Sequence, residues 1–251
     1  MQAIISDIHA NVEALQVVLE DIDRQKIDEI VCLGDIVGYG PNPKECMDLA
    51  ARFSAVLKGN HEHALCDELE ASNFNPKARK AVDWTRQQFW DFTGDREANA
   101  KRWDLIDSLQ MTLEAGDVMY AHGSPRDPIT EYIYPRDIYR PKKLEGIFAE
   151  IKWLCFVGHS HVPGVFTDDM EYRTPDELGF KYKIDERKTI INVGSVGQPR
   201  DGDPRACYLI LDDDNNVFWR KLHYPFAKTI QKMEQIPELD SFLAERLKQG
   251  R

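Results

Sequence analysis

Five short apolar stretches of this sequence are each followed directly by side chains that can bind a metal ion. Asp7 and His9 follow the first stretch, and Asp35 follows the second. The remaining three stretches lead into Asn60, His61, His122, His159 and His161. Of the seven histidines in the chain, five lie at these positions. This concentration at the ends of apolar stretches is the strongest functional signal in the sequence.

The residue types indicate a particular chemistry. Carboxylate and imidazole together suit borderline divalent metals, namely Mn, Fe, Zn or Ni. One carboxylate has two oxygens and can bridge two ions about 3.5–4 Å apart, and such a pair activates a shared water and holds phosphoryl oxygens during in-line displacement. A neighbouring histidine that binds no metal can supply the proton for a leaving oxygen. Taken alone, Asp-x-His and Gly-Asp favour a turn or a helix cap, Gly-Asn-His-Glu is balanced between the two interpretations, and Gly-His-Ser-His favours a functional site. The whole series at successive stretch ends is not explained by turns and caps.

The apolar stretches are continuous rather than alternating, and several contain Ile or Val. They cover residues 3–5, 30–33, 55–57, 118–121, 154–157, 190–193 and 207–211. Such stretches are typical of strands that are buried on both faces beneath helices. After the first stretch, apolar residues from Val12 to Ile22 fall on one helical face, with Asn11 as the predicted N-cap. These features predict an α/β fold, in which ligand sites gather at the carboxyl ends of the strands.

Residues 67–110 predict a helical insertion carried by the core. Asn75 and Pro76 form a typical helix start, a cap followed by an N1 proline. The apolar stripes of two expected helices consist of Ala78, Ala81, Val82, Thr85, Phe89 and Phe92, and then of Ala98, Leu105 and Leu109. We expect the polar residues 168–188 to form an exposed hairpin or loop, and residues 237–250 to form a terminal amphipathic helix.

Length and composition favour a single domain over residues 1–251, because a chain of this length can bury one substantial core. No apolar run approaches the roughly 18 residues that cross a bilayer, so no membrane partner is expected.

The N-terminus lacks the basic stretch of a secretory signal, and five cysteines without a Cys-x-x-Cys pair favour reduced thiols in the cytoplasm. The net charge of −11 argues against long nucleic acid as a partner, whereas a small anionic substrate is compatible with bound cations.

Six motifs together resemble the calcineurin-like metallophosphoesterase superfamily. They read SDIHAN, GDIVGYGP, GNHE, AHGSP, GHSH and NVGSVGQPRDGD. The resemblance is greatest to the smaller prokaryotic members of phosphodiesterase type. It covers residues 1–211, with the insertion as the least shared part. It implies a four-layer α-β-β-α sandwich of two mixed sheets flanked by helices, with a centre of two divalent metal ions at the strand ends.

The resemblance also implies a role for each candidate ligand. One metal ion would be held by Asp7, His9, Asp35 and His161. The other would be held by Asp35, Asn60, His122 and His159, so that Asp35 bridges the two ions. His61 would be the histidine that binds no metal and faces the leaving group.

One motif departs from the protein Ser/Thr phosphatases of this superfamily, which carry Gly-Asp-x-x-Asp-Arg-Gly. In those proteins the second acid supports the catalytic histidine and the arginine grips phosphate, but here Gly38 and Tyr39 stand in their places. A phosphoprotein phosphatase of that type is therefore disfavoured. Arg200 is either a phosphate contact or an ordinary surface charge after a turn. Tyr39 and Asn11 are candidates for the rim of the substrate pocket, with turn and cap duty as equal alternatives.

Three further features are open between function and packing. His63 either contacts substrate or, as we favour, is a polar residue on the first turn of a helix. Glu62 is a candidate for orienting His61, although adjacent residues on a helix point apart. Three of the five tryptophans lie in the insertion, where they could stack a base over the site. Aromatic residues at helical spacing more often pack in a core.

We therefore expect a cytoplasmic, two-metal phosphoesterase that acts on phosphodiesters or nucleotide-like compounds, dinucleoside polyphosphates included. A hydroxide that bridges the metals would attack phosphorus, and His61 would assist departure of the alcohol. The alternative is a phosphomonoesterase or a protein phosphatase. A non-catalytic protein-interaction scaffold is more remote, because it predicts eroded ligands and every candidate position is intact. The natural substrate, the metal identity and the oligomeric state are not determined by the sequence.

Overall fold

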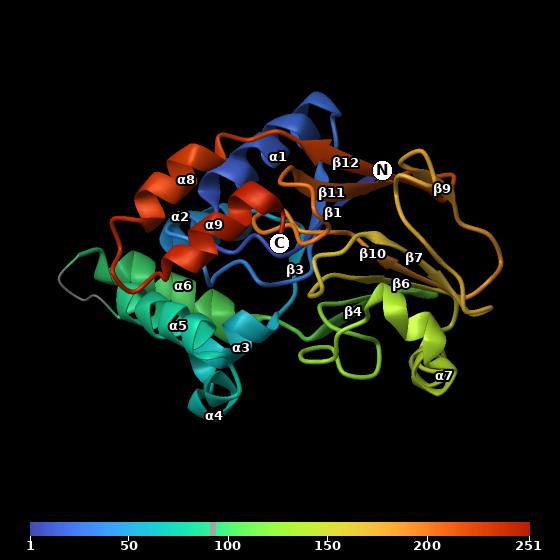
Figure 1. The fold of residues 1–251 in the computed structure, drawn as a ribbon, viewed down its shortest axis with the longest axis horizontal. Coiled ribbons are helices and arrows are strands. Elements are labelled where there is room, and N and C mark those ends of the chain that lie inside the picture. Colours follow the sequence, from blue (N-terminus) through green and yellow to red (C-terminus); the bar gives the residue numbers. More distant parts are fainter. Residues whose placement is uncertain (91–93) are drawn as a thin grey trace.

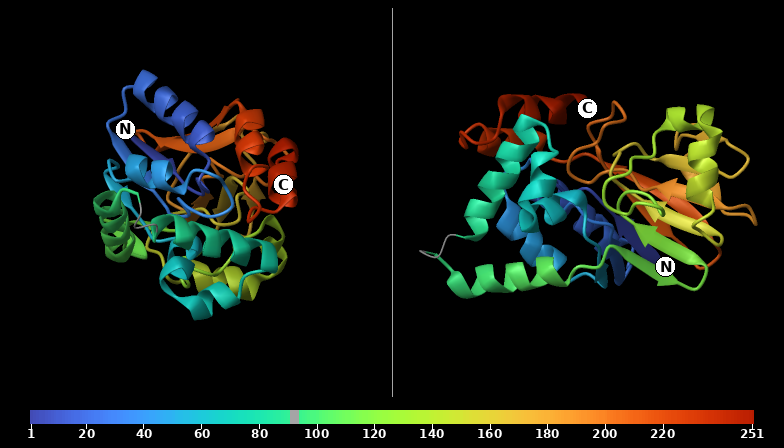
Figure 2. Two further views of the ribbon diagram at one scale, coloured as in Figure 1. Left: turned by 90° about the vertical axis from the view of Figure 1, so that its left-hand side faces the viewer. Right: turned by 90° about the horizontal axis from the view of Figure 1, so that it is seen from below.

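The structure of the chain is a computed structural model that describes residues 1–90 and 94–251. Within these residues two six-stranded sheets stack face to face, and helices cover their outer faces (Figure 1). This is the predicted α/β sandwich of two mixed sheets flanked by helices. Figure 2 shows the same layers from two other directions.

The first sheet has the strand order β3-β2-β1-β11-β12-β9. Its strands are β1 (Gln2–Ile5), β2 (Glu29–Cys32), β3 (Ala55–Val56), β9 (Lys181–Lys183), β11 (Ala206–Leu211) and β12 (Asn216–Leu222). β1, β2 and β3 run parallel, with Ile4 opposite Val31. Their carboxyl ends therefore lie along one edge of the sheet, while β11, β12 and β9 extend the sheet in antiparallel pairs.

The second sheet has the order β4-β5-β6-β10-β7-β8. Its strands are β4 (Thr112–Ala115), β5 (Val118–Ala121), β6 (Leu154–Val157), β7 (Gly164–Thr167), β8 (Tyr172–Arg173) and β10 (Thr189–Asn192). β5, β6 and β10 are parallel, and the flanking strands pair antiparallel. All seven strands expected from the apolar stretches are thus present.

The helices cover the sandwich from outside. They are α1 (Val12–Arg24), α2 (Pro43–Ala50), α3 (Asn60–Cys66), α4 (Glu68–Ser72), α5 (Pro76–Phe89), α6 (Arg96–Ser108), α7 (Pro141–Phe148), α8 (Phe226–Met233) and α9 (Ser241–Gln249), with a 3-10 turn η1 (Pro135–Tyr139). Asn11 Oδ1 accepts from the backbone N of Ala14 at 3.2 Å, which confirms the predicted cap of α1. Among residues 1–90 and 94–251, no helix has the length and apolarity that a membrane span requires.

The core has three layers that follow from the alternation of side chains along each strand. Ile4 of β1 packs between the sheets against residues such as Phe156 and Ile191. Its neighbour Ile5 points the other way and packs beneath α1 and α2. On the far side, Leu144 of α7 and its neighbours cover the second sheet. Both faces of the central strands are therefore buried, which explains why their sequences are continuously apolar.

Three helices, α4, α5 and α6, occupy most of the segment predicted as a helical insertion, and α5 begins at the predicted Asn75-Pro76 pair. Phe89 of α5 and Ile106 of α6 pack in the same buried cluster as Ile5 of β1. Phe92, which the apolar stripe also included, lies outside the described residues. The division of the chain into one domain with an inserted helical segment stays a prediction.

Of the two alternatives expected for residues 168–188, a hairpin or a loop, the structure excludes the hairpin. This segment is no hairpin, because β8 pairs with β7 in the second sheet whereas β9 pairs with β12 in the first. Tyr182 of β9 is buried between the sheets. The segment is polar because its two strands lie at sheet edges, and only alternate residues face the core. At the C-terminus, α9 begins at Ser241, where the Asp240 side chain accepts from the backbone N of Phe242.

Candidate metal centre and its cavity

The seven predicted metal ligands come together where five strands end. β1 leads into Asp7 and His9, β2 into Asp35, β3 into Asn60, β5 into His122, and β6 into His159 and His161. All except Asn60 are buried. Five of them have left-handed backbone φ values between 48° and 61°, a conformation that costs roughly 1–2 kcal/mol per non-glycine residue and that concentrates at functional sites.

One group of candidate ligands consists of Asp7, His9, Asp35 and His161, whose ligand atoms all lie within 4.8 Å of one another. His9 Nε2 lies 3.8 Å from Asp7 Oδ1 and 3.7 Å from Asp35 Oδ2, and His161 Nε2 lies 3.1 Å from Asp7 Oδ1. Asp7 Oδ2 accepts from the backbone N of His159 at 3.0 Å. That bond fixes the carboxylate so that Oδ1, which is buried and has no hydrogen-bond partner, faces the group.

A second group contains Asp35, His122 and His159. His122 Nε2 lies 3.3 Å from Asp35 Oδ2, 3.1 Å from His159 Nδ1 and 3.1 Å from Asn60 Oδ1. The other oxygen of Asp35, Oδ1, accepts from the backbone N of His61 at 2.9 Å. Asp35 Oδ2 therefore faces both groups, as a bridging ligand must. The assignment of the individual residues as ligands stays a prediction.

His9 and His161 present lone pairs, not N–H groups, to the centre. His9 Nδ1 lies 3.1 Å from the carbonyl oxygen of Val37, and His161 Nδ1 contacts the carbonyl oxygen of Gln198. A carbonyl only accepts, so both Nδ1 atoms carry the proton and both Nε2 atoms are bare. These two Nε2 atoms lie 3.1 Å apart. Two lone pairs this close repel unless a cation lies between them, so the site fits a divalent metal with mixed Asp and His ligands.

The charges of the centre also fit a bound divalent metal. Burial by itself would raise the pKa of Asp7, but the His161 and His122 imidazoles hold it well below its usual range. Burial likewise opposes ionisation of Asp35, yet His122 beside it holds that pKa well below the usual range too. Burial lowers the pKa of His159 to about 3, so its imidazole is neutral. Two buried, ionised carboxylates form a site that favours a cation.

His61 lies beside the centre without belonging to either group. The centroid of its ring is 4.8 Å from that of His9, 4.6 Å from that of Tyr39 and 4.9 Å from that of Phe74. A Cβ built on Gly38 would lie 2.0 Å from His61 Nδ1, which is buried without a hydrogen-bond partner. The glycine at the position of the second acid therefore makes room for this ring. Burial lowers the pKa of His61 to about 4, so the ring is neutral near pH 7.

Glu62 has a role that the sequence did not reveal. Its Oε2 accepts from the backbone N of Asp35 at 2.8 Å and of Gly59 at 3.0 Å, and its Oε1 accepts from the backbone N of Val37 at 3.0 Å. It therefore ties the loop after β2 to the start of α3. Among the described residues, no hydrogen bond joins Glu62 to the ring of His61. A sequence signal that could have indicated this role is the position of Glu62, the third residue of a helix whose N-cap is Gly59, which is the place of the glutamate in a capping box.

Arg200 and Tyr39, two of the predicted substrate contacts, lie together at the rim of the centre. Arg200 Nη2 donates to Gln198 Oε1 at 2.8 Å, and Arg200 Cζ lies 5.9 Å from the ring centroid of Tyr39. Arg200 Nε is buried and makes no hydrogen bond. The Tyr39 ring in turn contacts the rings of His9 and His61, each at 4.6 Å between centroids. Arg200 therefore keeps N–H donors for a phosphate oxygen next to the centre.

Asn11, the third predicted substrate contact, is explained by cap duty. Its Oδ1 accepts from the backbone N of Ala14 and from Thr229 Oγ1, and its Nδ2 donates to the Gly197 carbonyl and to Tyr224 Oη. These four bonds use the donors and acceptors of the amide, so no group is left over for a substrate. Cap duty, the alternative given for Asn11, therefore accounts for this side chain.

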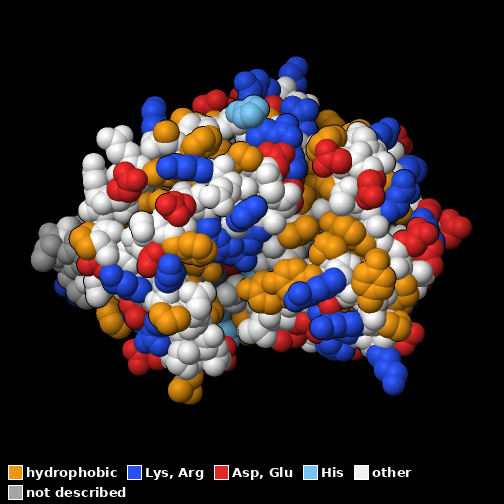
Figure 3. Space-filling model, viewed as in Figure 1, with side chains coloured by type: hydrophobic (Ala, Val, Ile, Leu, Met, Phe, Trp, Pro, Cys, Tyr) orange, Lys and Arg blue, Asp and Glu red, His pale blue; other side chains and the backbone are white. Residues whose placement is uncertain are grey.

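Arg246 of α9 is a second basic residue near this rim, and no sequence motif pointed to it. The C-terminal end of α9 is held against the loop after Arg200, because Gly202 N donates to the Gly250 carbonyl at 2.9 Å. Burial and the nearby Arg200 guanidinium lower the pKa of Arg246 to about 10. Arg246 Nε donates to the main-chain oxygen of Arg251, the last residue, and Arg200 Nη2 donates to Gln198 Oε1. Each guanidinium keeps further N–H groups besides these bonds, and Figure 3 shows basic side chains above the central hollow.

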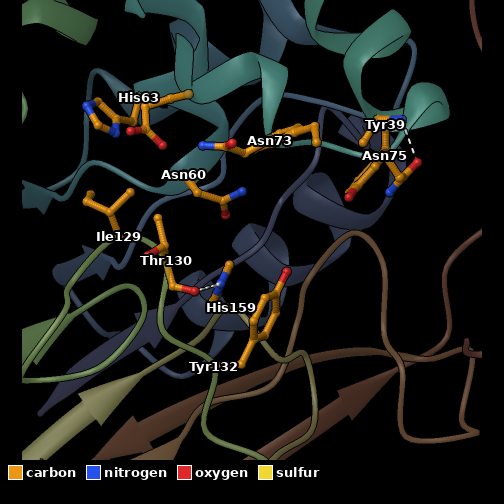
Figure 4. A pocket seen from close by; sticks show the side chains of 12 residues that line it. Tyr39, Asn60, His63, Asn73, Asn75, Ile129, Thr130, Tyr132 and His159 are labelled. Atoms are coloured by element: carbon orange, nitrogen blue, oxygen red, sulfur yellow. Dashed lines mark hydrogen bonds between the residues drawn. The ribbon is translucent and has the colours of Figure 1, made fainter.

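A cavity of about 500 Å³ opens beside the second group of ligands. It is lined by Tyr39, Asn60, His63, Glu70, Asn73, Phe74, Asn75, Ala78, Ile129, Thr130, Tyr132 and His159. Figure 4 shows Asn73 and Asn75 of the helical insertion along one side, the loop 129–132 together with His159 along the other, and Asn60 between them. His63 lies on the first turn of α3, as expected, but it also lines this cavity and its Nδ1 is buried without a partner. Its position favours the substrate contact that the sequence had disfavoured.

The fold and the paired Asp/His groups define a class of protein, and comparison with known sequences agrees. The model of the calcineurin-like phosphoesterase superfamily domain matches residues 1–216, so the chain belongs to this family. It is a metal-dependent phosphoric ester hydrolase, as predicted. Calcineurin-like phosphoesterases use two divalent metal ions, and the two groups that share Asp35 can hold one each.

Several relatives match the chain over its whole length. An uncharacterized protein of Methanocaldococcus jannaschii, MJ0912, is 36% identical over 260 residues, which cover 100% of this chain and 98% of that protein. A metallophosphoesterase of Sphaerobacter thermophilus with a known crystal structure is 38% identical, with a TM-score of 0.82 over 99% of this chain and 98% of that one. The hypothetical protein PH1004 of Pyrococcus horikoshii OT3 shares the fold at 18% identity, with a TM-score of 0.76 and coverage of 100% and 98%.

Proposed function

We propose that this hydrolase cleaves small phosphodiesters or nucleotide-like phosphate esters. One observation carries the proposal: two ligand groups share Asp35, and the second of them adjoins a cavity of about 500 Å³ that Asn60 and His159 line. A cavity of this size is typical of a small-molecule site. The rim at Arg200 lies apart from the lining of that cavity, so an ester with substituents on both sides of phosphorus finds a place for each.

The residues of the chain would divide the work. Bound divalent metals supply a nucleophile at neutral pH and neutralise charge on the phosphoryl group. Arg200 donates to a non-bridging phosphate oxygen, a charge-assisted bond that also orients the ester. His61 Nε2, the ring nitrogen away from Gly38, donates a proton to the departing alcohol oxygen. Because burial lowers the pKa of His61, the negative charge of the bound phosphate is needed before this ring takes up a proton.

The substrate and the location of the protein belong to the same proposal. The net charge of −11 disfavours long nucleic acid and favours a small phosphorylated molecule whose charge is met locally. Four of the five cysteines are buried free thiols, which suits a reducing compartment and hence the cytoplasm. Cell fractionation checks the location, and recovery of the protein from the culture medium contradicts it.

A hydrolysis panel on metal-loaded protein tests the activity. The substrates are an aryl phosphodiester, an aryl phosphomonoester, a phosphopeptide and a dinucleoside polyphosphate, each measured as kcat/KM. We expect the highest value for a diester or a nucleotide-like compound. Asp35→Asn and His61→Ala are each expected to lower it by at least about 10²-fold. If the diester signal survives both substitutions, it comes from a contaminant and the proposal fails.

The same panel distinguishes the alternatives. Faster turnover of the monoester or the phosphopeptide identifies a phosphomonoesterase or a protein phosphatase. Binding of a partner protein without turnover of any ester identifies a scaffold. Gly38 at the place of the second acid already disfavours the protein phosphatase, because His61 Nδ1 then has no carboxylate partner.

A further inference from the structure

The cavity beside the centre has a distinct chemical character. Apart from its histidines, Glu70 is the one charged side chain among the twelve lining residues that the structure describes. Asparagines, tyrosines and Phe74 supply most of the remaining wall. No lysine or arginine belongs to this described lining, and Arg200 and Arg246 lie outside it. The cavity is thus polar and aromatic, with a slight negative charge.

The position of the cavity relates it to one side of the reaction. Two of its walls, Phe74 and Tyr39, contact the ring of His61, with centroid distances of 4.9 Å and 4.6 Å. Asn60 and His159 line it as well, so it reaches the second ligand group (Figure 4). A substituent on phosphorus that extends into the cavity therefore has its bridging oxygen close to His61, the expected proton donor.

We propose that this cavity binds the leaving alcohol of the ester, and that this alcohol is an uncharged, ring-bearing group of the nucleoside class. The inference rests on the phosphoesterase function proposed above. It adds which side of the ester departs and what that side carries. In the reaction, water oxygen bonds to phosphorus, the bond from phosphorus to the 5′ oxygen of the nucleoside breaks, and a proton passes to that oxygen.

The charges argue against a polyphosphate in this cavity. Each additional phosphate needs a cation when it leaves water, and the described lining offers none. The carboxylate of Glu70 adds repulsion. The guanidiniums of Arg200 and Arg246 lie at the rim instead, next to the Tyr39 ring and α9. The anionic part of a substrate is therefore matched at the rim, and the uncharged part is matched in the cavity.

The hydrogen-bonding groups argue against a plain alkyl alcohol. The side-chain amide of Asn73 makes no hydrogen bond within the described residues. His63 Nδ1 is buried without a partner. Asn75 uses Oδ1 to cap α5 through the backbone N of Lys77 and Ala78, which leaves its Nδ2 as a donor. Donors and acceptors beside aromatic walls match a nucleobase or ribose, whereas an alkyl group leaves them unpaired.

The first test is the direction of cleavage of a nucleoside 5′-(methyl phosphate) diester by the full-length, metal-loaded protein. Hydrolysis releases either nucleoside and methyl phosphate or nucleotide and methanol. The two alcohols leave with similar intrinsic ease, so the product ratio reports which group occupies the cavity. We expect nucleoside and methyl phosphate to predominate by at least about tenfold. An excess of nucleotide and methanol overturns the proposal.

The second test uses Asn73→Ala, with Gln87→Ala as the matched control. Asn73 lines the cavity, whereas Gln87 is exposed on α5 outside the lining. We expect Asn73→Ala to move the product ratio about threefold or more toward nucleotide and methanol, because one bidentate contact is lost. The control is expected to keep the wild-type ratio. A product ratio is independent of the fraction of folded protein, so an unchanged ratio in Asn73→Ala contradicts the assignment.

The third test concerns charge. Glu70→Gln is expected to raise kcat/KM for a dinucleoside polyphosphate relative to the methyl diester by about two- to fivefold. Glu68→Gln on the same helix removes an equal charge outside the cavity and is expected to leave this ratio unchanged. If neither substrate is hydrolysed at all, the proposed function itself fails. If both are hydrolysed but no ratio responds to Asn73 or Glu70, only the cavity assignment fails.

Discussion

Replacing Gly38 with alanine tests how the loop after β2 positions His61. Gly38 has a φ of +88°, and an added Cβ would lie 2.0 Å from His61 Nδ1 and 2.7 Å from Cε1. Gly116 is the matched control, because its φ of +65° is also left-handed and no atom lies within 4 Å of its added Cβ. Both substitutions strain the backbone, but only Gly38→Ala displaces a ring.

The sizes of the two effects can be estimated separately. An alanine in the left-handed region costs roughly 1–2 kcal/mol, so we expect similar losses of unfolding free energy from the backbone in both variants. An ordinary van der Waals contact is about 3.5 Å, so the His61 ring must move by roughly 1.5 Å. The rings of Tyr39, Phe74 and His9 surround it and restrict where it can go. Misplacement of a reacting group by about 1 Å costs on the order of 10²-fold in rate, which is the expected loss in kcat.

The assay compares two diesters with different leaving groups, an aryl and an alkyl alcohol. A phenolate departs with little help from a proton, whereas an alkoxide needs it. We therefore expect Gly38→Ala to reduce kcat more for the alkyl diester than for the aryl diester. Metal content per chain and melting temperature are measured on both glycine variants, so that loss of metal or of folded protein is recognised.

Two results would refute this reasoning. Equal kcat values in Gly38→Ala and Gly116→Ala, with metal content unchanged, would show that the position of His61 does not affect the rate. An equal loss for both leaving groups would show that His61 does not protonate the departing oxygen. The second result would leave the steric argument intact and would remove His61 from its chemical role.

Three further predictions concern the centre. We expect Glu62→Gln to lower the melting temperature and kcat together. An amide cannot accept all three backbone hydrogen bonds that the Glu62 carboxylate accepts, and each unsatisfied buried donor costs about 1–3 kcal/mol. A melting curve equal to that of the wild type would contradict this prediction. Burial alone would lower the pKa of His122, but Asp35 and Asp7 raise it to about 9, so the metal-free protein holds a proton there below that pH. Metal binding at pH 7 is therefore expected to release a proton, counted by calorimetry in buffers of different ionisation enthalpy, and the release is expected to vanish above pH 9. A chelator is expected to lower the melting temperature of the wild type, because without metal the carboxylates of Asp7 and Asp35 repel each other. The decrease in melting temperature is expected to be smaller in Asp35→Asn, and scanning calorimetry measures both.

The parts of the fold that the sequence predicted are those whose signal is local. Strand β6 is a continuous apolar stretch in the sequence because both of its faces are covered. Helix α1 was predicted from its apolar face and from the N-cap residue Asn11. The candidate ligands were recognised for a related reason. Parallel strands place their carboxyl ends along one edge, so residues directly after such stretches converge whatever the detailed loop geometry.

The parts that the sequence did not predict depend on which distant elements meet. Tyr182 lies in a polar segment of the sequence, and its strand β9 forms only through pairing with the distant strand β12. Arg246 comes to the rim because the end of α9 bonds to the loop after Arg200. His63 faces a cavity because the loop 129–132 closes the far side. None of these contacts produces a helical or strand-like hydrophobic periodicity in the neighbouring sequence.

The order of residue types along this chain was thus enough to define its chemistry, an Asp and His centre for phosphoryl transfer on an α/β sandwich. Only the tertiary structure decided which acid organises the loops, which glycine makes room for His61, and which side chains line the cavity beside the centre. The physical reason is one of range. Ligand identity and strand burial are properties of neighbouring residues, whereas a cavity and its charge are made by side chains that the folded chain brings together from separate segments.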